Sequence, residues 1–206
     1  MSYRLLALDI DGTIVGGDLL VPDAVAQAIA AAQAHGVRVT LATGRMFGAT
    51  RPFAQQLGIH DPLICYQGGL IGDPVTGEVY EHTLMSGELA AEAIELLREV
   101  GIFTLAYVDE RLCVAERRPE LDVYLRWHPE GTEVVVAPDL ASYVAASPPT
   151  KLLFMSEPEV VEREMVRMVA HFGDRLAVIR SHAIFGELTS QGISKGAALK
   201  ALAHRL

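Results

Sequence analysis

The first third of the chain shows two patterns of apolar and polar residues, and these patterns alternate along the sequence. Short apolar runs, typical of buried strands, alternate with stretches whose apolar residues recur every three or four positions, as on one face of a helix. The runs cover residues 4–8, 37–41 and 62–66, and the helical stretches cover 22–36 and 45–57. Strand–helix–strand–helix–strand order predicts a parallel sheet with right-handed helical crossovers.

The pattern changes after Thr83, following a small hairpin expected over 70–83. Strands and helices then follow in an order typical of an α+β layer, and the chain returns to the first pattern at its last helix. Helices are expected at 86–100 and 119–127, between a capping box at Ser156 and Gly173, and after a cap at Ser194. Strands are expected at 102–108, 111–115, 132–137, 151–155, 175–180 and 184–189. The sequence therefore predicts a core over 1–83 and 189–206 with a second domain inserted over 84–188.

The first strand runs directly into two acids spaced two residues apart, in Asp9-Ile10-Asp11-Gly12-Thr13. A parallel strand that ends there presents both carboxylates at the carboxyl edge of the sheet, where open α/β folds bind ligands. Two such acids repel each other unless a cation lies between them, and hard oxygen ligands suit Mg²⁺. One carboxylate can attack an electrophile while the other moves a proton. The alternative interpretation is an ordinary acidic turn.

Two further segments place polar groups where neighbouring elements meet. Thr43-Gly44-Arg45 follows the second strand, so that the Thr43 hydroxyl can donate a hydrogen bond to a ligand and Gly44 allows close backbone approach; an ordinary helix cap is the alternative. Lys195 lies in the first turn of the last helix, where the helix dipole disfavours a cation. Only three lysines occur, which favours a specific purpose for this one, and an ordinary surface lysine is the alternative.

These segments resemble the haloacid dehalogenase superfamily of aspartate-nucleophile phosphotransferases, and the inserted layer resembles the large C2-type cap of its Cof-type branch. The resemblance implies an α/β fold with a Rossmann-like parallel-sheet core and an α+β cap domain. It implies that Asp9 is the nucleophile, that Asp11 is the general acid and base, and that both bind Mg²⁺. It further implies roles in catalysis or phosphate binding for four segments of the chain: Gly12, Thr43, Gly44-Arg45 and Lys195.

Two features depart from the family pattern. Gln67-Gly68-Gly69 stands where the family usually shows Asn-Gly-Ala, so any hydrogen bond from the amide must be re-aimed, and a plain loop is the alternative. The sequence also ends at Leu206 before a fourth motif, which in the family supplies a further metal carboxylate. We therefore expect a piece of a longer protein, with weak Mg²⁺ binding and little activity of its own.

Composition narrows the classes of partner. The formal net charge of −9 argues against general nucleic-acid binding. No apolar stretch reaches the roughly 18 residues that span a bilayer, and the chain starts on a strand instead of a signal peptide, so a cytoplasmic protein is expected. Cys65 and Cys113 lie in apolar runs, which predicts buried, reduced thiols.

The sequence as a whole predicts an Mg²⁺-dependent phosphomonoester hydrolase that forms an aspartyl-phosphate on small phosphorylated metabolites such as sugar phosphates. Two alternatives remain. A phosphomutase would share the intermediate but return the phosphoryl group to its substrate. A catalytically inactive binding or assembly fragment would be consistent with the missing fourth motif.

Overall fold

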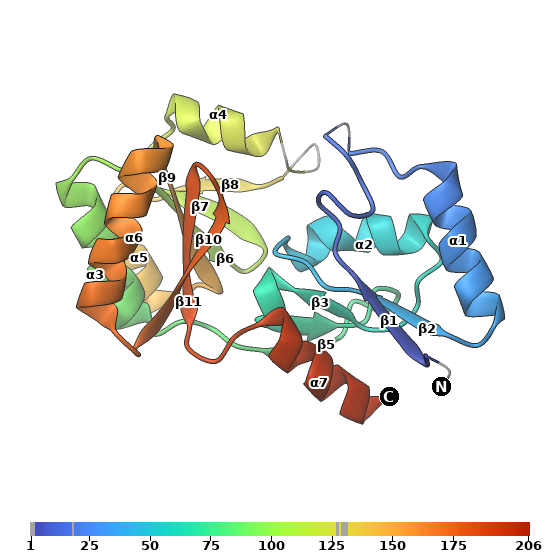
Figure 1. Ribbon diagram of the computed structural model, residues 1–206. Coiled ribbons are helices and arrows are strands. Elements are labelled where there is room, and N and C mark those ends of the chain that lie inside the picture. Colours follow the sequence, from blue (N-terminus) through green and yellow to red (C-terminus); the bar gives the residue numbers. More distant parts are fainter. Residues whose placement is uncertain (1–2, 18, 127, 129–131) are drawn as a thin grey trace. The chain divides into compact units, whose positions relative to one another are not determined.

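The computed structural model describes residues 3–17, 19–126, 128 and 132–206 (Figure 1). The chain divides into two compact units, each with its own sheets and helices. Unit 1 comprises Met1–His82 and Ile193–Leu206, and unit 2 comprises Thr83–Gly192. Unit 2 is thus a continuous insertion into a unit that two separate parts of the chain build together.

Unit 1 begins with the parallel strands that the apolar runs predict. β1 (Leu5–Leu8) pairs in parallel with β2 (Arg38–Leu41), and α1 (Asp23–Ala34) connects them. α2 (Phe47–Gln56) leads on to β3 (Leu63–Cys65), which continues the parallel arrangement through a bridge between Ala42 and Ile64. This order brings the ends of β1, β2 and β3 to one edge, where the candidate residues follow the strands.

The rest of unit 1 packs against β3. A short turn, η1 (Tyr66–Gly68), leads into the antiparallel strands β4 (Leu70–Gly72) and β5 (Val79–His82), which form the hairpin expected over 70–83. α7 (Lys195–Arg205) lies against this part, with its Ala198 and Leu202 in one buried apolar cluster with Ile64 and Ile71. The last helix therefore completes the core that the first strands begin.

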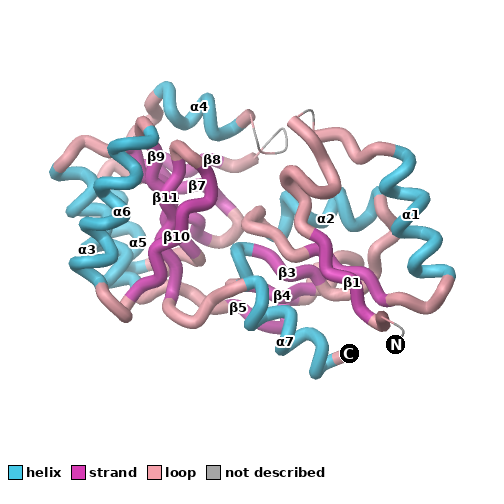
Figure 2. Tube along the Cα trace, in the orientation of Figure 1, coloured by secondary structure: helices cyan, strands magenta, loops and turns pink. Residues whose placement is uncertain are grey.

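Unit 2 is built on a six-stranded sheet of order β10-β11-β9-β6-β7-β8, antiparallel except for the β7–β8 pair. Its strands are β6 (Phe103–Val108), β7 (Arg111–Val114), β8 (Val134–Val136), β9 (Lys151–Met155), β10 (Leu176–His182) and β11 (Phe185–Ser190). Three helices, α3 (Gly87–Glu99), α5 (Leu140–Ala146) and α6 (Pro158–Phe172), lie together on one side of the sheet (Figure 2). Their buried side chains form one apolar core with those of the strands. α4 (Pro119–Leu125) contacts β11 through Tyr124 and Phe185.

Three local features differ from the sequence expectations. α5 was not expected; it begins at the cap Asp139, whose side chain accepts a hydrogen bond from the Ser142 amide at 3.0 Å. α6 does not begin with a Ser156 capping box, because Glu157 is the cap residue, without a side-chain hydrogen bond, and Pro158 takes the first helical position. β11 continues to Ser190, so that the two units divide at Gly192 instead of 188.

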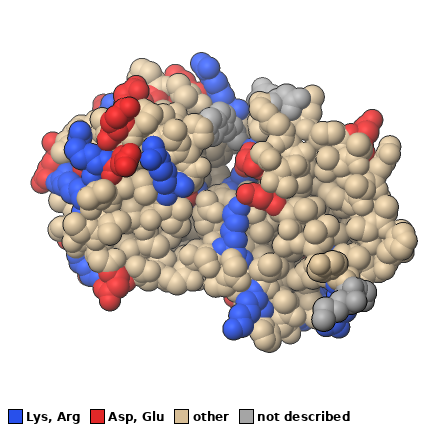
Figure 3. Space-filling view, in the orientation of Figure 1, with Lys and Arg blue, Asp and Glu red and all other residues tan. Residues whose placement is uncertain are grey.

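Charged side chains of both signs gather over α3 and α6 on the face of unit 2 seen in Figure 3. Arg167 on α6 lies 3.4 Å from Glu99 on α3, and Glu92 on α3 lies 2.6 Å from His171 on α6. Cys65 and Cys113 are buried free thiols, as expected. Within the described ranges, none of the helices has both the length and the apolar character that crossing a membrane requires.

Candidate active site

A tight loop after β1 carries the two acids. The Ile10 carbonyl accepts hydrogen bonds from the amides of Thr13, Ile14 and Val15 at 2.9–3.2 Å, which folds the chain back directly after the strand. Gly12 has a φ of +73°, in the left-handed region that favours glycine, and therefore permits this reversal. The loop holds the Asp9 carboxylate beside the end of β1, where its Oδ1 accepts from the Ile10 amide at 2.8 Å.

Lys195 reaches Asp9 from the other end of the chain. Its Nζ lies 2.7 Å from Asp9 Oδ2, and both side chains are partly exposed. Ser194 caps α7 by accepting a hydrogen bond from the Ala197 amide at 3.0 Å, which fixes the first turn that carries the lysine. The ion pair offsets the unfavourable position of a cation at a helix N-terminus.

Arg45 forms a second pair with Asp11. Its Nε and Nη2 donate to the two carboxylate oxygens at 2.9 and 2.6 Å, a two-pronged geometry that fixes both side chains. The guanidinium also lies over the Phe53 ring of α2, 5.2 Å from its centroid. Arg45, which is expected to bind phosphate, is therefore held by Asp11 in this structure.

Thr43 and Gly44 form the turn between β2 and α2. Thr43 is buried; its amide donates to the Ile64 carbonyl at 2.9 Å, and its Oγ1 accepts from the Arg45 amide at 3.2 Å. The hydroxyl proton is thus not used in that bond and can be donated elsewhere. A Cβ at position 44 would lie 2.6 Å from Gln67 Nε2, so the space beside Gly44 is filled by this amide.

All of the residues expected at the site lie in unit 1, and the strand ends bring them together as two acid–cation pairs beside a buried hydroxyl. The oxygen donors fit Mg²⁺ in kind, because this ion binds through one or two carboxylates and keeps much of its water. Among the described residues, no three His, Cys, Asp or Glu side chains gather as a metal cluster. The fit thus rests on Asp9 and the loop around Asp11.

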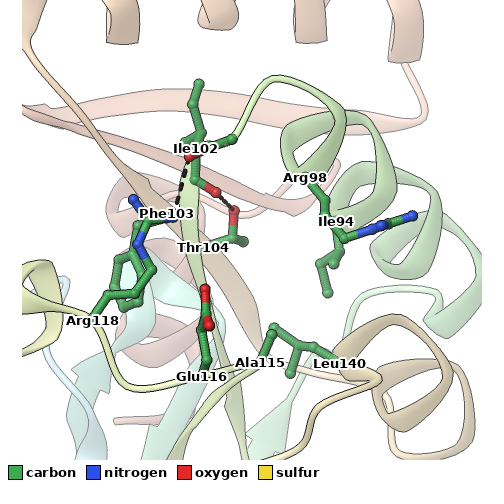
Figure 4. A pocket seen from close by; sticks show the side chains of 10 residues that line it. Ile94, Arg98, Ile102, Phe103, Thr104, Ala115, Glu116, Arg118 and Leu140 are labelled. Atoms are coloured by element: carbon green, nitrogen blue, oxygen red, sulfur yellow. Dashed lines mark hydrogen bonds between the residues drawn. The ribbon is translucent and has the colours of Figure 1, made fainter.

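Unit 2 holds a separate cavity of about 200 Å³, shown in Figure 4. Side chains from the end of α3, the start of β6 and the segment after β7 line it, and Glu116 is the one acid among its lining residues. Arg118 is occupied by the Gly101 carbonyl at 3.2 Å and by Glu120 at 2.6 Å. This cavity lacks the two carboxylate–cation pairs that unit 1 contains, so the candidate active site is assigned to unit 1.

Two neighbours of the site carry no decisive signal in the sequence. Phe53, under Arg45, is an ordinary apolar position of a helix until the fold places it. Gln67 could be noticed only as a departure from Asn in the resembling family, and its approach to Gly44 depends on the conformation of η1.

Known proteins resemble the chain in sequence and in fold. The haloacid dehalogenase-like hydrolase family matches residues 6–206. A predicted phosphatase of Streptococcus pyogenes is 29% identical over 220 residues, which cover 100% of this chain and 77% of the relative. Pyridoxal phosphate phosphatase of Escherichia coli is 35% identical over 113 residues, which cover 54% of this chain and 41% of the relative.

The fold comparison agrees with the sequence comparison. A crystal structure from Thermotoga maritima superposes with a TM-score of 0.82 at 25% identity, over 99% of this chain and 75% of that one. The family match covers almost the whole chain, including both acids, Thr43 and Lys195. The protein is therefore a member of the haloacid dehalogenase-like hydrolases, in the Cof-type branch, and an enzyme of the phosphatase type.

Proposed function

We propose that the protein is an Mg²⁺-dependent phosphomonoester hydrolase that uses Asp9 as its nucleophile on small phosphorylated metabolites. The observation that supports this most is the 2.7 Å contact between Lys195 Nζ and Asp9, beside the Arg45–Asp11 pair. A carboxylate next to a fixed ammonium group is in place to receive a phosphoryl dianion, since the cation offsets the repulsion between the two anions.

The reaction proceeds in two displacements. An Asp9 oxygen attacks phosphorus, the ester P–O bond breaks, and protonated Asp11 gives its proton to the leaving oxygen. Water then attacks the aspartyl-phosphate, Asp11 takes a proton from that water, and inorganic phosphate leaves with Asp9 restored. In the structure Arg45 donates to both oxygens of Asp11, so that it would turn from Asp11 to the phosphoryl oxygens when substrate binds.

The other residues bind the transferred group. Thr43 donates its hydroxyl proton, Gly44 allows close approach of the backbone, and Lys195 neutralises charge as the phosphorus becomes five-coordinate. Asp9 and the Asp11 loop would hold Mg²⁺, which supplies charge neutralisation at the phosphoryl oxygens when bound. Unit 2 corresponds to the α+β cap domain that the family resemblance implies, and we expect its side chains to select the substrate.

Several features support a small substrate in a cytoplasmic setting. A relative that is 35% identical over half of the chain is named for pyridoxal phosphate, a small phosphate monoester. The net charge of −9 is unsuited to long polyanions such as nucleic acids. The buried free thiols Cys65 and Cys113 are consistent with a reducing compartment.

The test is phosphate release from a panel of small esters, including pyridoxal 5′-phosphate and hexose phosphates, in Mg²⁺ and in EDTA. We expect release in Mg²⁺ only, and acid quenching should trap a protein species heavier by one phosphoryl group. An isomerised substrate without free phosphate would indicate a phosphomutase instead. No release and no trapped species with any ester would contradict the proposal.

A further inference from the structure

The turn η1 next to the candidate site has an unusual backbone. Tyr66 and Gln67 have φ values of +51° and +60°, and Gly68 follows with +105°. Side chains with a Cβ are unfavourable in this left-handed region, and two in succession are rarer still. Strained backbone of this kind is concentrated at functional sites, where the surrounding structure holds it in place.

The backbone of η1 joins the two segments that would bind phosphate. The Gln67 amide donates to the Thr43 carbonyl and the Tyr66 amide donates to the Arg45 carbonyl, each at 3.0 Å. On the other side, a Cβ at Gly68 would lie 2.4 Å from the Ser194 carbonyl oxygen and 3.1 Å from the Lys195 amide nitrogen. η1 is therefore wedged between the Thr43 turn and the first turn of α7.

The Gln67 side chain occupies the space beside Gly44. Its Nε2 lies 2.6 Å from the position that a Cβ of residue 44 would take, and the side chain is partly exposed. The structure shows no hydrogen bond from this amide to any residue that it describes. An amide carries two donors and an acceptor, so this one has donors to spare at the edge of the site.

We propose that Gln67 is a phosphate-binding residue, whose side-chain amide donates a hydrogen bond to a phosphoryl oxygen of the substrate. The proposal rests on the phosphatase function proposed above. It explains why a strained turn is maintained here, since the left-handed conformation directs the side chain over Gly44 instead of away from it. The competing explanation is that Gln67 only fills the space that Gly44 leaves open.

Two substitutions separate these explanations. Gln67→Glu keeps the shape but replaces the donors by a negative charge, and Gln67→Met keeps the bulk without any donor. Titration calorimetry with inorganic phosphate in Mg²⁺ is the direct measurement. We expect about ten- to a hundredfold weaker phosphate binding in both variants, the range for one hydrogen bond to a charged group, with the larger loss in Gln67→Glu. The KM for a hydrolysed ester should rise in parallel.

Gln56→Glu, on the exposed end of α2, introduces the same change of charge in the same unit and should bind phosphate like the unaltered chain. Wild-type affinity in both Gln67 variants would overturn the proposal and leave the space-filling explanation. Should either variant fail to fold by circular dichroism, Gln67→Asn decides. It tolerates a positive φ and keeps the amide, but it is one methylene shorter, so unchanged phosphate affinity would overturn the proposal.

Phosphate binding is measured without turnover, which keeps the two proposals distinguishable. If no ester is hydrolysed but phosphate binding falls in the Gln67 variants, the role of Gln67 stands while the hydrolase function fails. If the unaltered chain binds no phosphate, the role of Gln67 fails as well.

Discussion

Two of the three lysines form ion pairs with acids, in settings that differ sharply. Lys195 and Asp9 lie 2.7 Å apart in unit 1, with 32% and 42% of their side chains exposed. Lys151 and Glu187 lie 3.1 Å apart on the neighbouring strands β9 and β11 of unit 2, with only 3% and 5% exposed. The first pair remains open to solvent and ligands, whereas the second is shut away from both.

This difference determines what each pair can do. Solvent screens the Lys195–Asp9 attraction, so the pair contributes little to stability and can exchange its partners for a phosphoryl group. Lys151 also lies 4.6 Å from the centroid of the Tyr107 ring, and Glu187 Oε2 makes no well-oriented hydrogen bond within the described structure. A desolvated pair of this kind is held in place, and removing one partner leaves a buried charge uncompensated.

The largest expected effect comes from changing Asp9, the acid of the exposed pair, to its amide. Asp9→Asn removes the proposed nucleophile and should lower turnover by at least about a thousandfold. The melting temperature should stay close to that of the unaltered chain, because the lost pair is exposed. Asp174→Asn, at an exposed turn of unit 2, is the matched control. Near-normal phosphate release by Asp9→Asn would exclude the covalent mechanism.

Removing the buried lysine should have the largest effect on stability. Lys151→Met leaves Glu187 buried without its cation and should lower the free energy of unfolding by about 3–5 kcal/mol. Denaturant titration measures this change. Adding Glu187→Gln to Lys151→Met should recover much of the loss, because the uncompensated charge is then gone. A double variant as unstable as Lys151→Met alone would show that packing, not charge, determines the effect.

The same substitution in unit 1 should give the opposite result. Lys195→Met should reduce turnover by about a hundred- to a thousandfold, because the proposed reaction loses the positive group that would face the phosphoryl oxygens. The unfolding free energy should change by less than about 1 kcal/mol. Lys200→Met, on the exposed face of α7, should alter neither quantity. A large stability loss in Lys195→Met would mean that the two pairs do not differ as inferred.

The smallest effect concerns an acid held by hydrogen bonds. The Thr76 amide, together with the Val75 amide and the Tyr80 hydroxyl, lowers the pKa of Asp73 from its ordinary value of 3.8. A lowered pKa stabilises the folded state above pH 3.8, and the contribution is lost as the pH falls through the lowered value. Asp73→Asn should therefore lose less stability than the unaltered chain between about pH 4 and pH 2. If the unfolding free energy fell equally with pH in Asp73→Asn and in the unaltered chain, this prediction would be contradicted.

Much of the architecture could be predicted because it follows from local pattern. Apolar runs and caps indicated most strands and helices within a few residues, and Ser86 and Ser194 cap α3 and α7 as expected. The sequence does not predict α5, because a seven-residue helix has too few turns to show a period. The Ser156 cap was wrong because Pro158, with its fixed φ, determined where α6 begins.

The sequence indicates which residues gather at the candidate site, but not how they pair. The two acids, Thr43 and Lys195 follow from segments that end strands or begin a helix. The pairing of Arg45 with Asp11 and the approach of the Gln67 side chain to Gly44 depend on how three separate turns meet at the end of the sheet. No short-range pattern encodes such a meeting, because the partners are distant in sequence.

The divided construction of unit 1 has a consequence for the order of events during synthesis. Asp9 leaves the ribosome early, whereas Lys195 follows only after all of unit 2 has been made. At about 5–20 residues per second, this delay lasts roughly ten seconds or longer. Unit 2 is a continuous segment and can fold in that interval, during which unit 1 still lacks α7. The nascent chain can therefore fold its insertion before the Lys195–Asp9 pair is able to form.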